Sequence, residues 1–164
     1  MRPTLLKSRS DLEEVGIVKQ FTLPSVIANS WQRNLNVGLD PLSNPIALVV
    51  SNTDLQHRTE KLDSVMRFIR PELELLSTQM AGPNFLIGVA DADGVVLDVI
   101  IDEEFRGSAC GSCMPLGSIW TENIRGTNGF GTAIFTGKSC LVSGQEHFFK
   151  SDSSLSCVAA PIFN

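Results

Sequence analysis

The residues of this 164-residue chain best suited to covalent or metal chemistry are four cysteines and two histidines. Cys110 and Cys113 form a C-x-x-C pair, a spacing that holds zinc when two further ligands converge or that cycles as a dithiol. The chain has no second such pair, so redox or metal sensing stays an alternative hypothesis here and no metal is assigned. Cys140 and Cys157 fall in predicted strands, where a free cysteine is most often a small buried hydrophobe.

The histidines and the paired carboxylates offer weaker candidates. His147, in the stretch "GQEHFF", could ligate haem or a metal or hydrogen-bond a polar ligand. The other histidine is His57, and neither has a neighbouring Cys/His spacing, so a structural or surface role is the simpler interpretation. Asp91 and Asp93 resemble an acid–base pair, but beside Gly94 they are typical of a turn. The sequence therefore indicates no catalytic residue and identifies no cofactor.

The stretch "IRGTNGFGTAIFTG", residues 124–137, has the glycine content of a phosphate-binding loop. A dinucleotide fingerprint needs G-x-G-x-x-G directly after a strand, and a P-loop ends in G-K-[ST]. The order Gly126, Gly129, Gly131 with no following lysine fits neither motif. Both phosphate-binding interpretations are excluded.

The same stretch fits the start of a helix. Gly126 is expected to make a turn, Thr127 or Asn128 to cap the helix, and Gly137 to end it. Its buried side is predicted to be Phe130, Ala133, Ile134 and Phe135. The two glycines in its first turns each cost about 1 kcal/mol relative to alanine, so either close packing on a sheet or a ligand at the helix start must favour them.

A ligand pocket, if the second explanation holds, should lie around that helix start. Trp120 would form an apolar wall, the early N–H groups would act as donors, and the sheet face that carries Cys157 would close the space. The candidate ligand-binding residues are Trp120, Asn128, Gly129, Phe130, His147 and Cys157.

Composition narrows the class of protein. An apolar content of 43% over 164 residues matches one globular domain with an extension. Thirteen basic residues are scattered against 18 acidic ones, which disfavours direct contact with nucleic acid. No apolar run is long enough to span a membrane, and "MRPTLLKSRS" lacks the apolar stretch of a secretory signal, so a cytoplasmic location is expected.

Hydrophobic patterning predicts the elements that must position these residues. A short helix is expected in "LPSVIANSWQRN", with Pro24 and Ser25 at its start. The residues from Asp54 to Met80 show mostly helical spacing and predict one long amphipathic helix with a possible kink at Pro71.

The second half of the chain is predicted to form mainly strands. "NFLIGVADADGVVLDVIID" predicts a β-hairpin turning at Asp93 and Gly94, and a loop is expected from about Glu103 to Leu116. Two further strands are predicted in "KSCLVSG" and "LSCVAAPIF". This order favours an α+β fold, an antiparallel sheet with helices on one face, preceded by an N-terminal helical extension. The predicted domains are the extension, 1–53, and the α+β domain, 54–164.

Four segments together resemble a known family: "SWQRNLNVGLDP", "DADGVVLDV", "GSIWTENIRGTNGFGTAIFTGKSCLVSGQEHF" and "CVAAPIF". As a set they look like the N-terminal sensory region of bacterial transcription activators of the acetoin-catabolism-regulator type. The resemblance implies a GAF domain, a fold that senses small molecules. In that family it usually precedes an ATPase module, which works with sigma-54 RNA polymerase, and a DNA-binding helix-turn-helix.

The resemblance also implies parts that these residues do not contain. Family members continue after "APIF" into another strand and a closing helix, whereas the sequence given ends at Asn164. That strand would lie centrally in a GAF sheet, so we expect open strand edges or completion of the sheet by other residues or another chain. No Walker motif or DNA-reading helix is recognisable, so ATP hydrolysis and promoter binding are not assigned to this segment.

Two functional hypotheses follow. The first is a regulatory domain that binds a small-molecule effector and forms a homodimer through the long helix. The second is a stand-alone GAF enzyme similar to the free methionine sulfoxide reductase, which would use cysteine thiols. The second depends on fold-level analogy, because no matching motif places the cysteines, and we favour the sensor.

Overall fold

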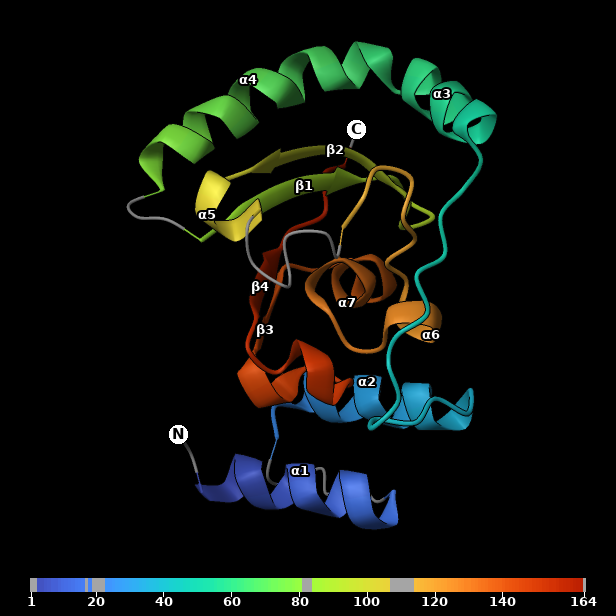
Figure 1. The fold of residues 1–164 in the computed structure, drawn as a ribbon, viewed down its shortest axis with the longest axis vertical. Coiled ribbons are helices and arrows are strands. Elements are labelled where there is room, and N and C mark those ends of the chain that lie inside the picture. Colours follow the sequence, from blue (N-terminus) through green and yellow to red (C-terminus); the bar gives the residue numbers. More distant parts are fainter. Residues whose placement is uncertain (1–2, 17, 19–22, 81–83, 107–113, 164) are drawn as a thin grey trace. The chain divides into compact units, whose positions relative to one another are not determined.

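The computed structural model describes residues 3–16, 18, 23–80, 84–106 and 114–163, which pack as two compact units (Figure 1). The first unit joins residues 1–46 to residues 120–164, and the second contains residues 47–119. The first unit is therefore discontinuous in sequence. The predicted domain boundary after residue 53 was drawn from the sequence pattern, whereas these units are defined by packing. The boundary therefore stays a prediction.

A β-hairpin forms the sheet of the second unit. Strands β1 (Leu86–Ala90) and β2 (Val96–Ile101) pair antiparallel, with Leu86 opposite Ile101. In the turn, the Asp91 carboxylate accepts the N–H groups of Asp93 and Val95, each at 3.0 Å. The hairpin prediction is confirmed, and this aspartate acts as a turn-former.

Two helices, rather than one, precede the hairpin. Helix α3 (Asn52–Lys61) and helix α4 (Asp63–Gln79) are separated at Leu62, whose φ of −103° and ψ of 5° are not helical. The prediction of one helix with a kink at Pro71 is wrong, because α4 continues through that proline. Both helices contact β2, and Arg70 of α4 pairs with Asp98 at 2.7 Å. Helical spacing alone does not reveal a break of one residue, since the apolar positions of both helices stay nearly in phase.

The predicted loop after the hairpin begins with a helical turn, α5 (Glu103–Arg106). The Asp102 carboxylate caps this turn by accepting the N–H of Phe105 at 3.0 Å. The prediction of a loop is therefore wrong at residues 103–106. Cys110 and Cys113 lie outside the described residues.

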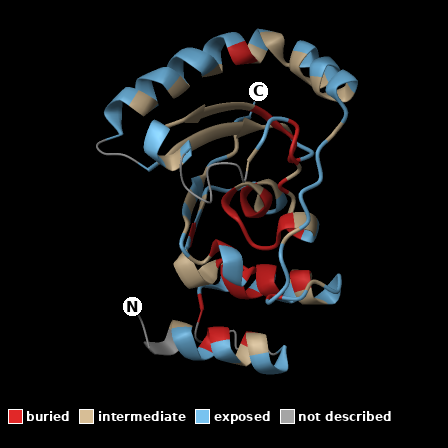
Figure 2. Ribbon diagram, in the orientation of Figure 1, coloured by how far each residue is buried: buried red, intermediate tan, exposed pale blue. Residues whose placement is uncertain are grey.

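Helices α1 (Pro3–Val15) and α2 (Ser25–Asn36) supply one side of the core of the first unit. Helix α2 begins after Pro24, as predicted, and Figure 2 shows its buried face. The Trp31 side chain is fully buried, and its indole N–H donates to the Glu146 carbonyl at 2.8 Å. The buried core residues are Leu12, Leu23, Ile27, Ala28, Trp31, Val142, Phe148 and Phe149.

The glycine-rich stretch forms two short helices, α6 (Glu122–Arg125) and α7 (Gly129–Thr136). Asn128 is the N-cap of α7, because its side-chain oxygen accepts the Gly131 N–H at 2.9 Å, and Gly137 ends the helix in the left-handed region. These predictions are confirmed. The predicted buried side is confirmed at Ala133 and wrong at Phe135, which is 61% exposed, while Phe130 and Ile134 are half-buried. The fully buried residues of α7 are Gly129, Gly131, Thr132 and Ala133.

Strands β3 (Cys140–Ser143) and β4 (Ser156–Ala159) pair antiparallel, and both contact α7. Between them lie two 3-10 turns, η2 (Gly144–Glu146) and η3 (Lys150–Asp152). Strand β4 is shorter than the predicted run to Phe163 because the chain leaves the ladder before Pro161, which has no N–H to donate. The α+β class is confirmed. In the described part of the chain, the named strands form two two-stranded ladders rather than one.

Close packing accounts for the two glycines at the start of α7. A Cβ on Gly129 would lie 3.0 Å from the Cys157 Cβ, and a Cβ on Gly131 would lie 2.7 Å from the Trp120 carbonyl oxygen. Both distances are shorter than ordinary van der Waals contact. The helix can therefore approach β4 and the α6 segment only because these side chains are absent.

Gly126→Ala should destabilise the protein more than Gly137→Ala, although both glycines have a φ of 63°. The backbone strain of alanine, about 1–2 kcal/mol, is common to both variants. Only the Cβ at position 126 meets a neighbour, the Phe148 Cβ at 2.7 Å, which adds about 1–3 kcal/mol of overpacking. Urea denaturation of the two variants measures the difference, and equal losses would contradict the packing shown here.

Candidate functional site

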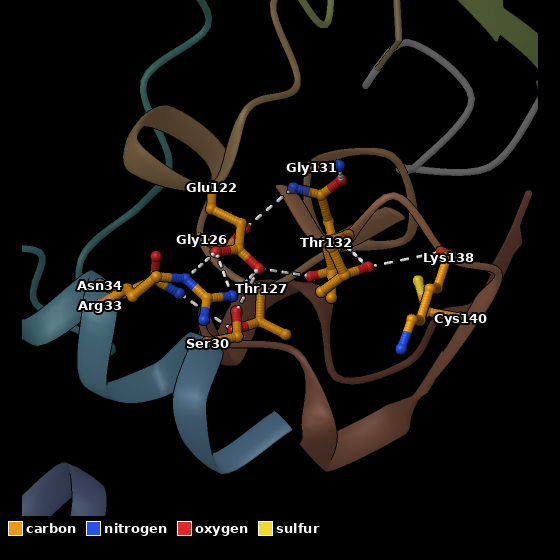
Figure 3. A network of polar contacts seen from close by, with 12 residues as sticks. Ser30, Arg33, Asn34, Glu122, Gly126, Thr127, Gly131, Thr132, Lys138 and Cys140 are labelled. Atoms are coloured by element: carbon orange, nitrogen blue, oxygen red, sulfur yellow. Dashed lines mark hydrogen bonds and ion pairs between the residues drawn. The ribbon is translucent and has the colours of Figure 1, made fainter. Parts of the chain in front are cut away.

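A buried carboxylate, Glu122, is the centre of the first unit's polar interior. Its side chain lies at the start of α6 and only 7% of the residue is exposed. The Ser30 hydroxyl donates to it at 2.6 Å, the Thr132 hydroxyl donates at 2.7 Å, and the Arg33 Nε–H donates to its second oxygen at 2.8 Å. Figure 3 shows these side chains converging from α2, α6 and α7. The carboxylate therefore has a cationic partner and hydrogen bonds to both oxygens.

A second layer of polar side chains supports the first. The Ser30 and Thr127 hydroxyl oxygens are 2.6 Å apart, and the Asn34 amide N–H donates to Thr127 at 2.9 Å. Since the Ser30 hydrogen is used on Glu122, the Thr127 hydroxyl must donate to Ser30 while accepting from Asn34. The remaining Asn34 oxygen is buried without a hydrogen-bond partner among the described residues.

A cavity of about 480 Å³ lies beside this network, within the first unit. Its apolar walls come from Val37, Ile134 and Phe135, and the Arg33 guanidinium stacks 3.7 Å above the Phe135 ring. The full lining is Arg33, Asn34, Asn36, Val37, Thr121, Glu122, Asn123, Gly131, Ile134 and Phe135. Apolar walls with a few polar groups at one side suit a small organic molecule.

The six sequence-predicted ligand residues form two groups. Asn128 donates an amide N–H to the Trp120 carbonyl at 3.1 Å, and the Phe130 ring meets the Trp120 ring edge-on with centroids 6.4 Å apart. The second group contains Gly129, His147 and Cys157. Cys157 packs against Gly129 and lies 3.3 Å from His147. The described lining of the cavity includes none of the six, and their role in binding stays a prediction.

His147 is 1% exposed, and burial holds the pKa of its imidazole below the ordinary value of 6.5. Between a structural and a surface role, the buried position fits the structural one, and the ligand-binding role considered from the sequence stays a prediction. The described residues contain no group of three histidine, cysteine or acidic side chains that could hold a metal ion.

Sequence reasoning missed the residues that surround the cavity and its carboxylate. Ser30, Arg33 and Asn34 have the i, i+3, i+4 spacing of one helix face, but such a polar face is usually solvated. The sequence feature that could have indicated the site is Glu122, the acidic residue in "TENIRGT", directly before the glycine stretch. Its pairing with an arginine 89 residues away requires the fold.

Fold and site together define the class of protein, a GAF-like α+β domain with a cavity of small-molecule size. The fold is similar to that in the crystal structure of the E. coli DhaR(N)–DhaL complex, with a TM-score of 0.79 and 17% sequence identity. That similarity covers 86% of this chain and 48% of the solved chain.

The chain belongs to the family described as MimR, N-terminal domain, which it matches over residues 4–164. It is 33% identical over 141 residues to the acetoin catabolism regulatory protein of Cupriavidus necator, covering 85% of this chain and 21% of that protein. It is 27% identical to the propane 2-monooxygenase operon transcriptional activator MimR of Mycolicibacterium smegmatis, covering 95% and 26%. With AcoR of Bacillus subtilis, the acetoin dehydrogenase operon transcriptional activator, identity is 28%, covering 90% and 24%.

These relatives confirm the resemblance drawn from the sequence. The chain is a regulatory domain of the kind found in such activators, and it spans about a quarter or less of the length of these three relatives. All three are named as regulators, so they give no support to the methionine sulfoxide reductase alternative. Within the described residues, no helix is long and apolar enough to cross a membrane.

Glu122→Gln should cost about 3 kcal/mol of unfolding free energy, because it leaves the Arg33 guanidinium without its carboxylate in a largely buried site. Glu14→Gln is the matched control, since Glu14 is exposed and its hydrogen bond among the described residues is the exposed one from Ser10, so the variant should change stability by less than about 0.5 kcal/mol. Chemical denaturation followed by tryptophan fluorescence measures both. A loss at Glu122 no larger than that at Glu14 would show that the network does not stabilise the unit.

Proposed function

We propose that this domain binds a small organic effector in the cavity between α2, α6 and α7, and that binding controls the output of a longer transcription activator. The observation that carries the proposal is the placement of the cavity directly against the Glu122 network. Arg33 belongs to both: its guanidinium bonds Glu122 and also covers Phe135 at the cavity.

Because Arg33 belongs to both the cavity and the Glu122 network, a ligand in the cavity can affect α2 and α7 together. An effector that bonds the guanidinium or displaces it from Phe135 changes the charge balance at Glu122. The carboxylate also holds Thr132 of α7 and Ser30 of α2 through their hydroxyls. A ligand shifts such a network only by the difference in its affinity for the two arrangements, so contact with Arg33 is central.

The proposed effector is a small, uncharged molecule with a hydroxyl or carbonyl group and a short apolar body, such as a hydroxy ketone. The apolar walls would take the carbon chain, and Arg33, which lines the cavity, would be a donor. Two of the relatives are named for acetoin catabolism or acetoin dehydrogenase, which makes acetoin the first compound to test. In the proposed full-length protein, acting in the cytoplasm, the output modules would be an ATPase working with sigma-54 RNA polymerase and a DNA-binding helix-turn-helix.

Ile134→Phe should weaken effector binding by placing a bulkier ring in the cavity wall, without lowering the melting temperature of the unliganded protein by more than a few degrees. A thermal-shift screen of small hydroxy ketones, diols and hydroxy acids measures this, because a ligand that binds only the folded state raises the melting temperature. The wild-type protein should respond to at least one compound.

Two controls make the screen decisive. Val158→Phe adds the same aromatic ring at an exposed position of β4 that does not line the cavity, and should keep the response. Phe130→Ala probes the pocket predicted from the sequence. A response lost in Phe130→Ala but kept in Ile134→Phe would move the site to the predicted residues, and no response to any compound would count against effector binding.

We also propose that the domain forms a homodimer through α4. Its exposed face carries large apolar side chains that no described residue covers, with Phe68 80% exposed. The exposed apolar residues of this face are Phe68, Leu75, Leu76 and the adjoining Met80. The spacing of i, i+7 and i+8 forms one stripe, and antiparallel pairing with a second copy would set each Phe68 against the partner's leucines, as a two-fold interface requires.

Phe68→Arg should convert the dimer to a monomer, because it sets one charge from each copy against the leucines of its partner in the paired stripe. Light scattering coupled to size-exclusion chromatography measures the mass over a range of concentrations. Val15→Arg, on an exposed position of α1 outside the stripe, should leave the dimer intact. A wild-type protein that stays monomeric at high concentration would refute the assembly.

A further inference from the structure

His147 and Cys157 make a contact that effector binding in the cavity does not use. The His147 Nε2 lies 3.3 Å from the Cys157 Sγ, and the His147 Nδ1 lies 3.0 Å from the Gly144 carbonyl oxygen. The histidine follows η2, and the cysteine lies in β4. One ring nitrogen of the imidazole therefore contacts the Cys157 sulfur, and the other contacts the Gly144 carbonyl oxygen.

The donor and acceptor properties of these three groups determine which atoms carry the hydrogens. A backbone carbonyl can only accept, so the Nδ1 must carry the hydrogen that it donates to Gly144. Burial disfavours the charged imidazolium, so near neutral pH the Nε2 is an unprotonated acceptor. The thiol hydrogen of Cys157 is then directed at the Nε2. Nucleophile, base and a group that orients the base are the three parts of an activated nucleophile.

The surroundings hold the base in place. From α1, the Arg9 guanidinium donates to the His147 and Phe148 carbonyls at 2.6 and 2.8 Å. The other charged groups that face the imidazole are Glu146 of η2 and Asp152 of η3, which favour its protonation, whereas burial and Arg9 oppose it. Burial is the dominant influence, so the ring stays neutral.

Cys157 is only half-buried, whereas its base His147 is fully buried. The Cys157 Cβ packs against Gly129, the first residue of α7.

We propose that Cys157 and His147 form a nucleophile–base pair that makes Cys157 a site of covalent attachment for small, uncharged, conjugated carbonyl compounds. The sulfur forms a bond to the β-carbon as the C=C π bond breaks. The thiol proton passes to the His147 Nε2 and then to the α-carbon of the adduct. The step is a net addition that needs no oxidant, reductant or further reactant.

Acrylamide is a suitable probe, because it is small, uncharged and conjugated. Site-resolved mass spectrometry of the full chain gives a separate adduct rate for each cysteine. Cys140 is the internal control: it is half-buried too, but its thiol donates to the Gly129 carbonyl, and burial, with the charge of Glu122, raises its pKa. We expect Cys157 to react at least about 100-fold faster at neutral pH, the low end of the range for a positioned base.

The pH profile separates a base-assisted thiol from a merely accessible one. With a neutral imidazole as base, the rate at Cys157 should stay nearly constant from about pH 7.5 down to about 6.5, the ordinary histidine pKa, since that of His147 lies lower. A thiol that reacts only as free thiolate loses about tenfold per pH unit over the same range. A tenfold fall at Cys157, parallel to that at Cys140, would overturn the proposal and leave the contact as an internal hydrogen bond.

His147→Asn tests the base directly. The asparagine amide N–H takes the place of Nδ1 and can still bond the Gly144 carbonyl but cannot take a proton, so the Cys157 rate should fall about 100-fold while the Cys140 rate stays the same. Circular dichroism checks that the variant folds. If it does not fold, the wild-type pH profile alone decides the proposal, and unchanged Cys157 reactivity in a folded variant would refute it.

Discussion

The first unit depends on one requirement: the Glu122 carboxylate is buried and must be neutralised where it lies. An unpaired carboxylate in an apolar interior is among the most costly groups that a protein can hold. Its partners come from separate parts of the chain, with Arg33 and Ser30 on α2 and Thr132 on α7. Satisfying the charge therefore fixes the position of α2 against the glycine-rich helices, and it holds the Arg33 side chain where it lines the cavity.

Local chemistry made several elements predictable. The Asp-Gly turn, the Asn128 cap and the left-handed Gly137 each follow from contacts within a few residues, and each is confirmed. The capped turn at Asp102 also depends on contacts within a few residues. The acidic residues "DEE" that begin it could have been used to predict it from the sequence. The break at Leu62 was not, since it interrupts the helical backbone without interrupting the apolar spacing.

The site was less predictable because its contacts are long-range. The glycines of α7 signalled a close approach, but whether to a ligand or to packed backbone depends on what lies 3 Å away from Gly129 and Gly131. Cys157 and His147, both chosen as ligand residues, do lie together, though the sequence could not show that one bonds the other. Arg33 was not singled out from the sequence, because its partner Glu122 is distant along the chain.

The discontinuous first unit has a consequence for how the protein is made. The hairpin unit is a single stretch, residues 47–119, and its contacts can form as soon as that stretch leaves the ribosome. The other unit closes contacts such as Arg9 with His147, which are 138 residues apart, so its N-terminal helices must wait for nearly the whole segment to be synthesised. Contacts of such high sequence separation slow folding. During that interval the apolar faces of α1 and α2 lack their partners, which makes the nascent N-terminal segment the natural client of a chaperone.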